Sequence, residues 1–491
     1  MPDDRSPKDK ADAPAGPGLS PDEFRRHAHA FVDWMADYYE GVEDYPVRAQ
    51  VQPGEIAAQL PAAAPETSEP IEAIFKDFQD IILPGMTHWQ HPSFFAYFPA
   101  NGSPPSLLAE MLTASLGAQC MSWQTSPAAT ELEDRIMEWL RDLLGLPRDF
   151  TGCIQDTAST GILAAIVTAR EWATDFTVNQ KGLSGGAPLT LYCSAETHSA
   201  TEKGAKIAGI GRDYVRKVPL NPGRGMNPEL LAQMIRADRQ AGLRPFCVVA
   251  TLGSTGTGAM DPLKPIGEIC KAEKLWLHVD AAWAGSALIL PETRAMIDGI
   301  ELADSFVFNP HKWLFTNFDC SVFFIREPEY LVRSFEILPE FLKTREGARV
   351  NNYRDWGVPL GRRFRALKLW FVLRSYGAEG LRTLIRAHIK LAQEIAERIE
   401  AEPDFELVTP ASLALFSFRY RPDEMDEGEE LDALNERFFE ALNDTGKVYF
   451  TQNRVDGAYV IRWSVGQTAT ERRHVEAAWA LVLKTARAMT V

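Results

Sequence analysis

Between about residues 150 and 330 the sequence alternates short apolar runs with segments of helical spacing, such as residues 227–239. The apolar runs are Leu189–Ser194, Phe246–Leu252, Leu275–Asp280, Ser305–Asn309 and Ser321–Ile325. This alternation predicts an α/β domain built on a mainly parallel sheet. Such sheets bind ligands beyond the carboxyl ends of their strands. Polar residues at those ends are therefore the first candidates for a functional site.

The rest of the chain predicts three further parts. Residues 1–18 are charged and rich in proline, alanine and glycine, which is typical of a disordered tail. Residues 19–100 begin with helical spacing, and we expect an N-terminal helical segment there. The large domain should then cover residues 101–385, followed by a small C-terminal α+β domain over residues 386–491. The strand candidates of the small domain are Ala414–Tyr420 and Tyr459–Val465.

Charge and cysteine usage limit the class of protein. The formal net charge of −16 argues against binding to nucleic acid or to an anionic membrane. The six cysteines are scattered, without a CxxC pair or a His/Cys cluster, so we expect reduced thiols, no metal site and a cytoplasmic protein. The sequence has no run of roughly 18 apolar residues, so we expect no membrane span. It has no apolar stretch at the N-terminus, so we expect no secretory signal.

Lys312 and Asp280 each follow an apolar run, and together they suit one kind of chemistry. A lysine amine can hold an aldehyde cofactor as an imine. A carboxylate can keep a pyridine nitrogen protonated, so that the ring accepts electrons, which is how pyridoxal phosphate (PLP) works. Either residue taken alone would more often be a surface lysine or an ordinary aspartate at a strand end.

Three other polar loops could complete such a site. Residues 155–161 precede an apolar helix, so they could cradle a phosphate or could simply cap the helix. His198 follows a strand and could stack on a flat ring, although a lone histidine is more often structural. The hydroxyl-rich loop 251–257 could contact a cofactor or be a plain turn, and Asn309 and His311 could reach phosphate oxygens.

An aromatic-rich segment, residues 87–99, precedes these loops by some distance in the chain. Its side chains could form a flat apolar pocket for an aromatic substrate. They could equally pack a domain interface, and the spacing does not separate the two interpretations.

In combination, these stretches resemble the aromatic-L-amino-acid decarboxylases, the group II PLP-dependent decarboxylases. The resemblance runs in order from about residue 20 to 485, through HWQHPSFFAYFP, SWQTSPAATELE, IQDTAS, ETHSA, VATLGSTGTG, LHVDAAWAGSA, FNPHKWLFTNFDCS and WGVPLGRRFRALKLWFVLR. It implies fold type I, the aspartate aminotransferase-like fold, and a homodimer with its active sites at the subunit interface, where residues 19–100 would contribute to dimerisation. It also implies decarboxylation of an aromatic L-amino acid such as tyrosine, DOPA, phenylalanine or tryptophan.

The resemblance also implies residue roles. Lys312 would carry the cofactor, Asp280 would pair with the pyridine nitrogen, and His198 would stack on the ring. The residues expected around the phosphate and along the cofactor are Thr157, Ala158, Ser159, Asn309, His311, Thr255 and Ala282. Those expected around the substrate ring are Trp89, Tyr97, Phe98 and Pro99, with Met121 reaching across the dimer.

Phe341 departs from the family pattern, which usually has a tyrosine at this place in a long polar loop, residues 327–352. A tyrosine hydroxyl can deliver a proton to the carbanion, and phenylalanine cannot. Family members with phenylalanine here resemble aromatic aldehyde synthases, which release aldehyde, ammonia and hydrogen peroxide. Either this chain also forms an aldehyde, or another acid or a water molecule delivers the proton to the carbanion. Glutamate-type decarboxylation and a catalytically inactive relative are the remaining alternatives.

Overall fold

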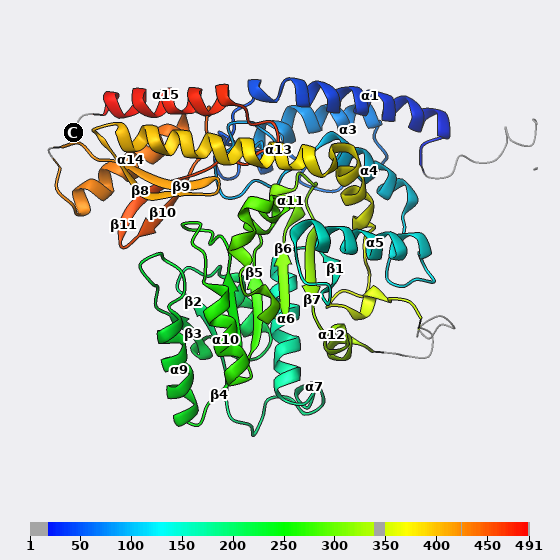
Figure 1. Ribbon diagram of the computed structural model, residues 1–491. Helices are drawn as coiled ribbons and strands as arrows, with labels where there is room; N and C mark the ends of the chain where they lie inside the picture. Colours follow the sequence, from blue (N-terminus) through cyan, green and yellow to red (C-terminus); the bar gives the residue numbers. More distant parts are fainter. Residues whose placement is uncertain (1–17, 338–348, 424, 490–491) are drawn as a thin grey trace, which may run out of the picture.

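The computed structural model describes residues 18–337, 349–423 and 425–489 (Figure 1). The tail expected over residues 1–18 therefore lies, apart from Gly18, outside the described residues, and so does Phe341. No helix in these ranges is long and apolar enough to cross a membrane.

Seven strands form the central sheet, in the order β1-β7-β6-β5-β4-β2-β3. The pairs from β3 to β6 are parallel, whereas β7 runs antiparallel to both β1 and β6. This confirms the predicted mainly parallel sheet. The strands are β1 (Thr151–Gln155), β2 (Leu189–Ser194), β3 (Val215–Val218), β4 (Arg244–Thr251), β5 (Trp276–Asp280), β6 (Ser305–Phe308) and β7 (Ser321–Ile325).

Helices cover both faces of this sheet, because its central strands are apolar on both sides. Helix α6 packs against β4 to β7 on one face, whereas α9 and α10 pack against β4 on the other. The helices of this part are α4 (Pro104–Leu116), α5 (Pro127–Leu144), α6 (Ala158–Ala173), α7 (Val178–Lys181), α8 (Ala200–Ile207), α9 (Pro228–Gln240), α10 (Leu263–Glu273), α11 (Pro310–Trp313) and α12 (Pro328–Phe335).

A separate antiparallel sheet, in the order β10-β11-β9-β8, forms the small C-terminal part. The long helix α13 (Arg365–Ala401) connects it to the large sheet and bends at Gly377, whose φ is 63°. The other elements are β8 (Phe405–Ser412), β9 (Leu415–Tyr420), α14 (Glu429–Asp444), β10 (Thr451–Val455), β11 (Ala458–Ser464) and α15 (Arg472–Ala488). Figure 1 shows α14 and α15 at one end of α13.

The N-terminal segment is helical, as predicted, with α1 (Pro21–Glu40), α2 (Glu55–Gln59) and α3 (Ile71–Asp77). Ser20 caps α1 in a reciprocal capping box with Glu23. Helices α1 and α3 pack through aromatic side chains, with the ring centroids of Phe31 and Phe75 4.5 Å apart. Both rings are half-buried by this contact, whereas Phe24 and Val32 of α1 and Ile74 of α3 remain exposed.

Several local predictions need correction. Strands β1 and β3 were not expected, because Gly152 and Gln155 interrupt the apolar pattern of β1, and Arg216 and Lys217 interrupt that of β3. The polar loop expected over residues 327–352 begins with α12, whose apolar side covers α6.

Candidate active site

Asp280 and Lys312 lie at the carboxyl end of the central sheet. Asp280 is the last residue of β5. The neighbouring strand β6 ends at Phe308, and Asn309 and Pro310 then start the short helix α11, which carries Lys312. Since β5 and β6 are adjacent and parallel, both side chains emerge at the same edge of the sheet.

The surroundings of these two residues change their proton affinities in opposite directions. Burial lowers the pKa of Lys312 to about 8, although the Asp280 carboxylate partly opposes this. Burial raises the pKa of Asp280, opposed by Lys312 and by the backbone N–H of Ala282, which donates to Asp280 Oδ1 over 3.0 Å. Lys312 therefore has a substantial neutral fraction near neutral pH, as a nucleophilic amine requires.

Both residues line a cavity of about 230 Å³. The structure places every residue expected to contact the cofactor around this one cavity: Thr157, Ala158, Ser159, His198, Thr255, Asp280, Ala282, Asn309, His311 and Lys312. Thr251 and Gly253, from the loop 251–257 singled out in the sequence, also line it, and the lining residues that the sequence did not predict are Ile162, Ala200 and Trp283.

One end of the cavity is suited to an anion. It is formed by the N-terminus of α6, where the Thr157 side chain makes no capping hydrogen bond within the described chain. The first N–H groups of a helix lack partners in the helix and attract negative charge. His311 accepts a hydrogen bond from the Cys320 N–H at Nδ1 over 2.9 Å, so its neutral ring carries the proton on Nε2. This end can therefore donate several hydrogen bonds to a phosphate.

Two further observations fit a flat, polar ring in the cavity. His198 accepts a hydrogen bond from the Ala200 N–H at Nδ1 over 3.1 Å, which fixes its tautomer, and burial and the Lys312 charge lower its pKa. Asn309 Oδ1 is buried without a hydrogen-bond partner among the described residues. A buried polar atom of this kind calls for a partner, so the residues present fit PLP.

Phe98 is the residue of the aromatic segment that reaches this cavity. Its ring stacks on Trp283, with centroids 4.3 Å apart and planes at 13°, and Lys312 Nζ lies 5.1 Å from its centroid. Trp89, Tyr97 and Pro99 do not line the cavity: Trp89 stacks on Tyr97, and Tyr97 is 47% exposed. Met121 also lies away from it, with its carbonyl accepting from the Arg354 N–H.

Sequence reasoning missed Arg462 of β11, which approaches the site from the small sheet. Its guanidinium carbon lies 4.5 Å from the Phe98 centroid, and its Nε donates to the Thr255 carbonyl over 2.7 Å. Nη2 is buried without a hydrogen-bond partner among the described residues, which supply no carboxylate to this side chain. The available signal was an arginine within the mostly apolar run 459–465, since a charged residue in a buried strand normally needs a partner.

No group of three or more His, Cys, Asp or Glu side chains in the described ranges is arranged to hold a metal ion.

Comparisons with known proteins agree with this geometry. The pyridoxal-dependent decarboxylase conserved domain matches residues 53–421. Tyrosine decarboxylase 1 of Narcissus pseudonarcissus is 43% identical over 486 residues, which cover 96% of this chain and 94% of that protein. Phenylacetaldehyde synthase of Arabidopsis thaliana is 42% identical over 474 residues, which cover 94% and 96%.

A solved structure gives the same result for the fold. The crystal structure of Oryza sativa TDC with PLP and tryptamine superposes with a TM-score of 0.93 at 36% identity, covering 96% of this chain and 99% of that one. The family match extends over most of the chain and includes every residue that lines the cavity. This chain belongs to the pyridoxal-dependent decarboxylase family.

Proposed function

We propose that this protein decarboxylates aromatic L-amino acids to the corresponding amines and carbon dioxide, with PLP as its cofactor. The observation that carries the proposal is the position of Lys312: its amine shares one cavity with Asp280 and His198 and lies 5.1 Å from the ring of Phe98. The relatives that act on tyrosine, and the structure that holds tryptamine, support an aromatic substrate.

The cofactor supplies an aldehyde that joins the substrate amine and a ring that accepts the electron pair left by carbon dioxide. The N-terminus of α6, Asn309 and His311 would hold the phosphate. The Asp280 carboxylate would stabilise positive charge at the ring nitrogen, and His198 would lie against the ring. Lys312 would carry the cofactor and would accept or return a proton at Nζ, for which a pKa of about 8 is well placed.

We further propose that Phe98 and Arg462 position the substrate. The Phe98 ring offers an apolar face beside Lys312. Arg462 is buried, and burial lowers its pKa to about 9, so it stays positively charged at neutral pH. Its free Nη2 could receive the substrate carboxylate as a charge-assisted hydrogen bond. Arg462 does not itself line the cavity, but its guanidinium carbon lies 4.5 Å from the ring centroid of Phe98, which does.

Aldehyde formation is the second candidate, and Phe341 is the observation that favours it. This residue lies outside the described ranges, but a phenylalanine has no proton to give to a carbanion. Phenylacetaldehyde synthase of Arabidopsis thaliana is as similar to this chain as the tyrosine decarboxylases are.

One experiment separates the two candidates. The PLP-loaded enzyme is given each aromatic L-amino acid in aerated buffer, and amine, aldehyde and hydrogen peroxide are quantified together. Amine with little peroxide supports the decarboxylase. Aldehyde with matching peroxide supports the synthase, and Phe341→Tyr should then restore the amine. Absence of product from every aromatic substrate would refute the proposed substrate class.

We also propose that the protein is a cytoplasmic homodimer, with residues 19–100 and α4 at the subunit interface. Leu108, Leu112 and Leu116 of α4 are exposed by 54%, 49% and 65%, and they follow the i, i+4, i+8 spacing of one helix face. Val358 and Leu360 are exposed as well. Apolar exposure concentrated on one helix face is typical of an interface. Six buried free thiols support a reducing compartment.

A further inference from the structure

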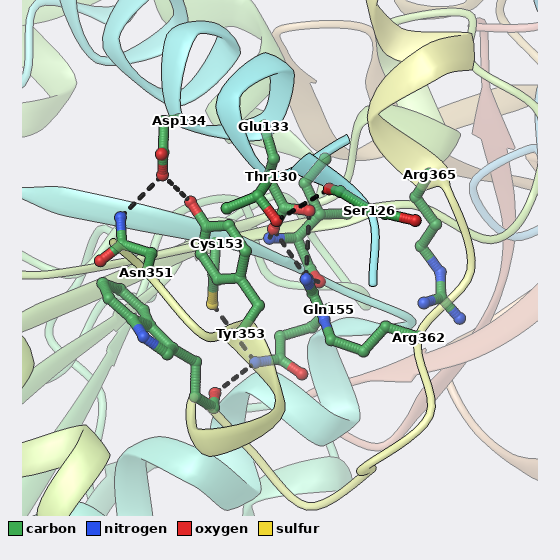
Figure 2. A network of polar contacts seen from close by, with 12 residues as sticks. Ser126, Thr130, Glu133, Asp134, Cys153, Gln155, Asn351, Tyr353, Arg362 and Arg365 are labelled. Carbon is green, nitrogen blue, oxygen red and sulfur yellow. Dashed lines mark hydrogen bonds and ion pairs between the residues drawn. The ribbon is translucent and has the colours of Figure 1, made fainter. Parts of the chain in front are cut away.

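Strand β1 leads directly into the phosphate end of the cavity, and among the described residues it is an edge strand that pairs with β7 alone. Its residue Ile154 makes both of its outward backbone hydrogen bonds to side chains (Figure 2). The N–H donates to Glu133 Oε1 over 2.8 Å, and the carbonyl accepts from Arg362 Nη2 over 2.5 Å. Glu133 and Arg362 thus take the place of a missing neighbouring strand.

Glu133 and Arg362 are also a buried ion pair. Arg362 Nη2 lies 2.7 Å from Glu133 Oε1 and Nη1 lies 3.2 Å from Oε2, a bidentate arrangement, and the two side chains are only 4% and 8% exposed. The guanidinium carbon lies 4.7 Å from the centroid of the Tyr353 ring. Tyr353 in turn donates its hydroxyl hydrogen to Asp134, as Figure 2 shows. The two parallel hydrogen bonds of a guanidinium–carboxylate pair fix its geometry. A lysine ammonium group cannot reproduce this bidentate contact.

The next residue of β1 is held from the same side. Gln155 Nε2 donates to the Trp356 carbonyl over 2.8 Å. A Cβ at position 357 would lie 2.9 Å from that nitrogen, so Gly357 permits this close approach. Gln155 is two residues before Thr157, the first residue of the phosphate end. The two residues before Asp156 are therefore fixed by contacts with Glu133 and residues 356–362.

We propose that Glu133 and Arg362 are positioning residues for the cofactor. They fix the path of β1, and thereby place the N-terminus of α6 and Thr157 to Ser159 where the phosphate binds. The inference rests on the proposed phosphate end of the cavity, and it adds two residues, 229 positions apart in the sequence, that touch neither cofactor nor substrate.

The test compares Arg362→Lys and Glu133→Gln with the control Arg216→Lys. Arg216 also forms a bidentate pair, with Asp238, but at the far edge of the sheet on β3. For each protein, the PLP dissociation constant is measured by titrating the apoenzyme and following the visible absorbance of the bound cofactor. The melting temperature of the apoenzyme and kcat at saturating PLP are recorded alongside.

We expect Arg362→Lys and Glu133→Gln, the two clamp variants, to raise the PLP dissociation constant about tenfold or more. Each variant loses a charge-assisted hydrogen bond, either to the backbone of Ile154 or between residues 133 and 362. At saturating PLP, kcat should stay close to that of the unmodified enzyme, and Arg216→Lys should leave PLP affinity unchanged. Gln155→Met keeps the ion pair and loses the Nε2 hydrogen bonds to the Trp356 carbonyl and to Cys153 Sγ. It should raise the constant by a smaller factor, and it serves as the readout if the charged variants fail to fold.

Two results would overturn the inference. One is an unchanged PLP dissociation constant in the folded variants Arg362→Lys, Glu133→Gln and Gln155→Met, with a lowered melting temperature alone. The other is a loss of PLP affinity in Arg216→Lys as large as in the clamp variants. Ser159→Asp tests the phosphate assignment separately, because it places a negative charge at the N-terminus of α6, where the phosphate is proposed to bind. If that variant also binds PLP normally, the proposed phosphate end is wrong.

Discussion

At the scale of single residues, we predict that the proton affinity of Lys312 controls the rate at which the apoenzyme captures its cofactor. Because burial lowers the pKa of the amine to about 8, a protonated lysine loses its charge as the pH rises through that value. The neutral amine is the reactive form. We expect the rate of covalent PLP incorporation into the apoenzyme to rise roughly tenfold per pH unit below about pH 8 and to level off above it.

Stopped-flow absorbance of apoenzyme mixed with PLP measures this profile, with Lys312→Ala as the control that binds without covalent capture. A rate that keeps rising to about pH 10 would mean an ordinary, solvated lysine amine.

Phe98 is predicted to determine how well the substrate ring is held. Phe98→Leu keeps an apolar side chain but removes the flat face beside Lys312 and the stacking on Trp283. We expect KM for aromatic substrates to rise between about twofold and tenfold, since an aromatic pair contributes roughly 0.5–1.5 kcal/mol beyond its buried area.

Phe95→Leu is the matched control for steady-state kinetics. Phe95 is equally buried in the same segment but packs on Phe450 and Trp463 and does not line the cavity. Equal KM values for the two variants would exclude a direct role of Phe98 in substrate binding.

At the scale of elements, the bend in α13 depends on one glycine. Gly377 has φ 63° and ψ 167°, a conformation that L residues adopt at a cost of about 1–3 kcal/mol. No heavy atom lies within 4 Å of a Cβ built there, so Gly377→Ala should destabilise the fold through backbone strain alone. Gly380→Ala, three residues further on and in ordinary helical contact, should be neutral or stabilising by up to about 1 kcal/mol.

Urea unfolding of both alanine variants tests this difference, with the midpoint and slope compared with those of the unmodified protein. Equal midpoints for the two variants would show that the bend can straighten without loss of stability.

At the scale of the whole molecule, the exposed leucines of α4 predict self-association. Leu112→Glu places a charge in the middle of the proposed interface, and we expect sedimentation to shift from dimer towards monomer, with a loss of activity if the site needs both subunits. Ile207→Glu is the control, because Ile207 of α8 is 63% exposed and does not belong to that face. A dimer that tolerates Leu112→Glu would place the interface elsewhere.

The sequence by itself determined most of the local structure and the centre of the site. Apolar runs marked β2, β4, β5, β6 and β7, because buried parallel strands are apolar on both faces. The polar residues after those runs, Asp280 and Lys312 among them, could be placed at one edge of the sheet, since the strands of such a sheet end together.

Only the tertiary structure decided which distant residues meet. Arg462 reaches Phe98 from the small sheet, and Glu133 pairs with Arg362 across 229 positions, contacts that no local period encodes. Of the aromatic segment, the sequence could not tell that Phe98 faces the cavity whereas Trp89 and Tyr97 turn away from it. The physical reason is the range of the forces: hydrophobic periodicity acts within one element, whereas ion pairs and ring contacts depend on how whole elements pack.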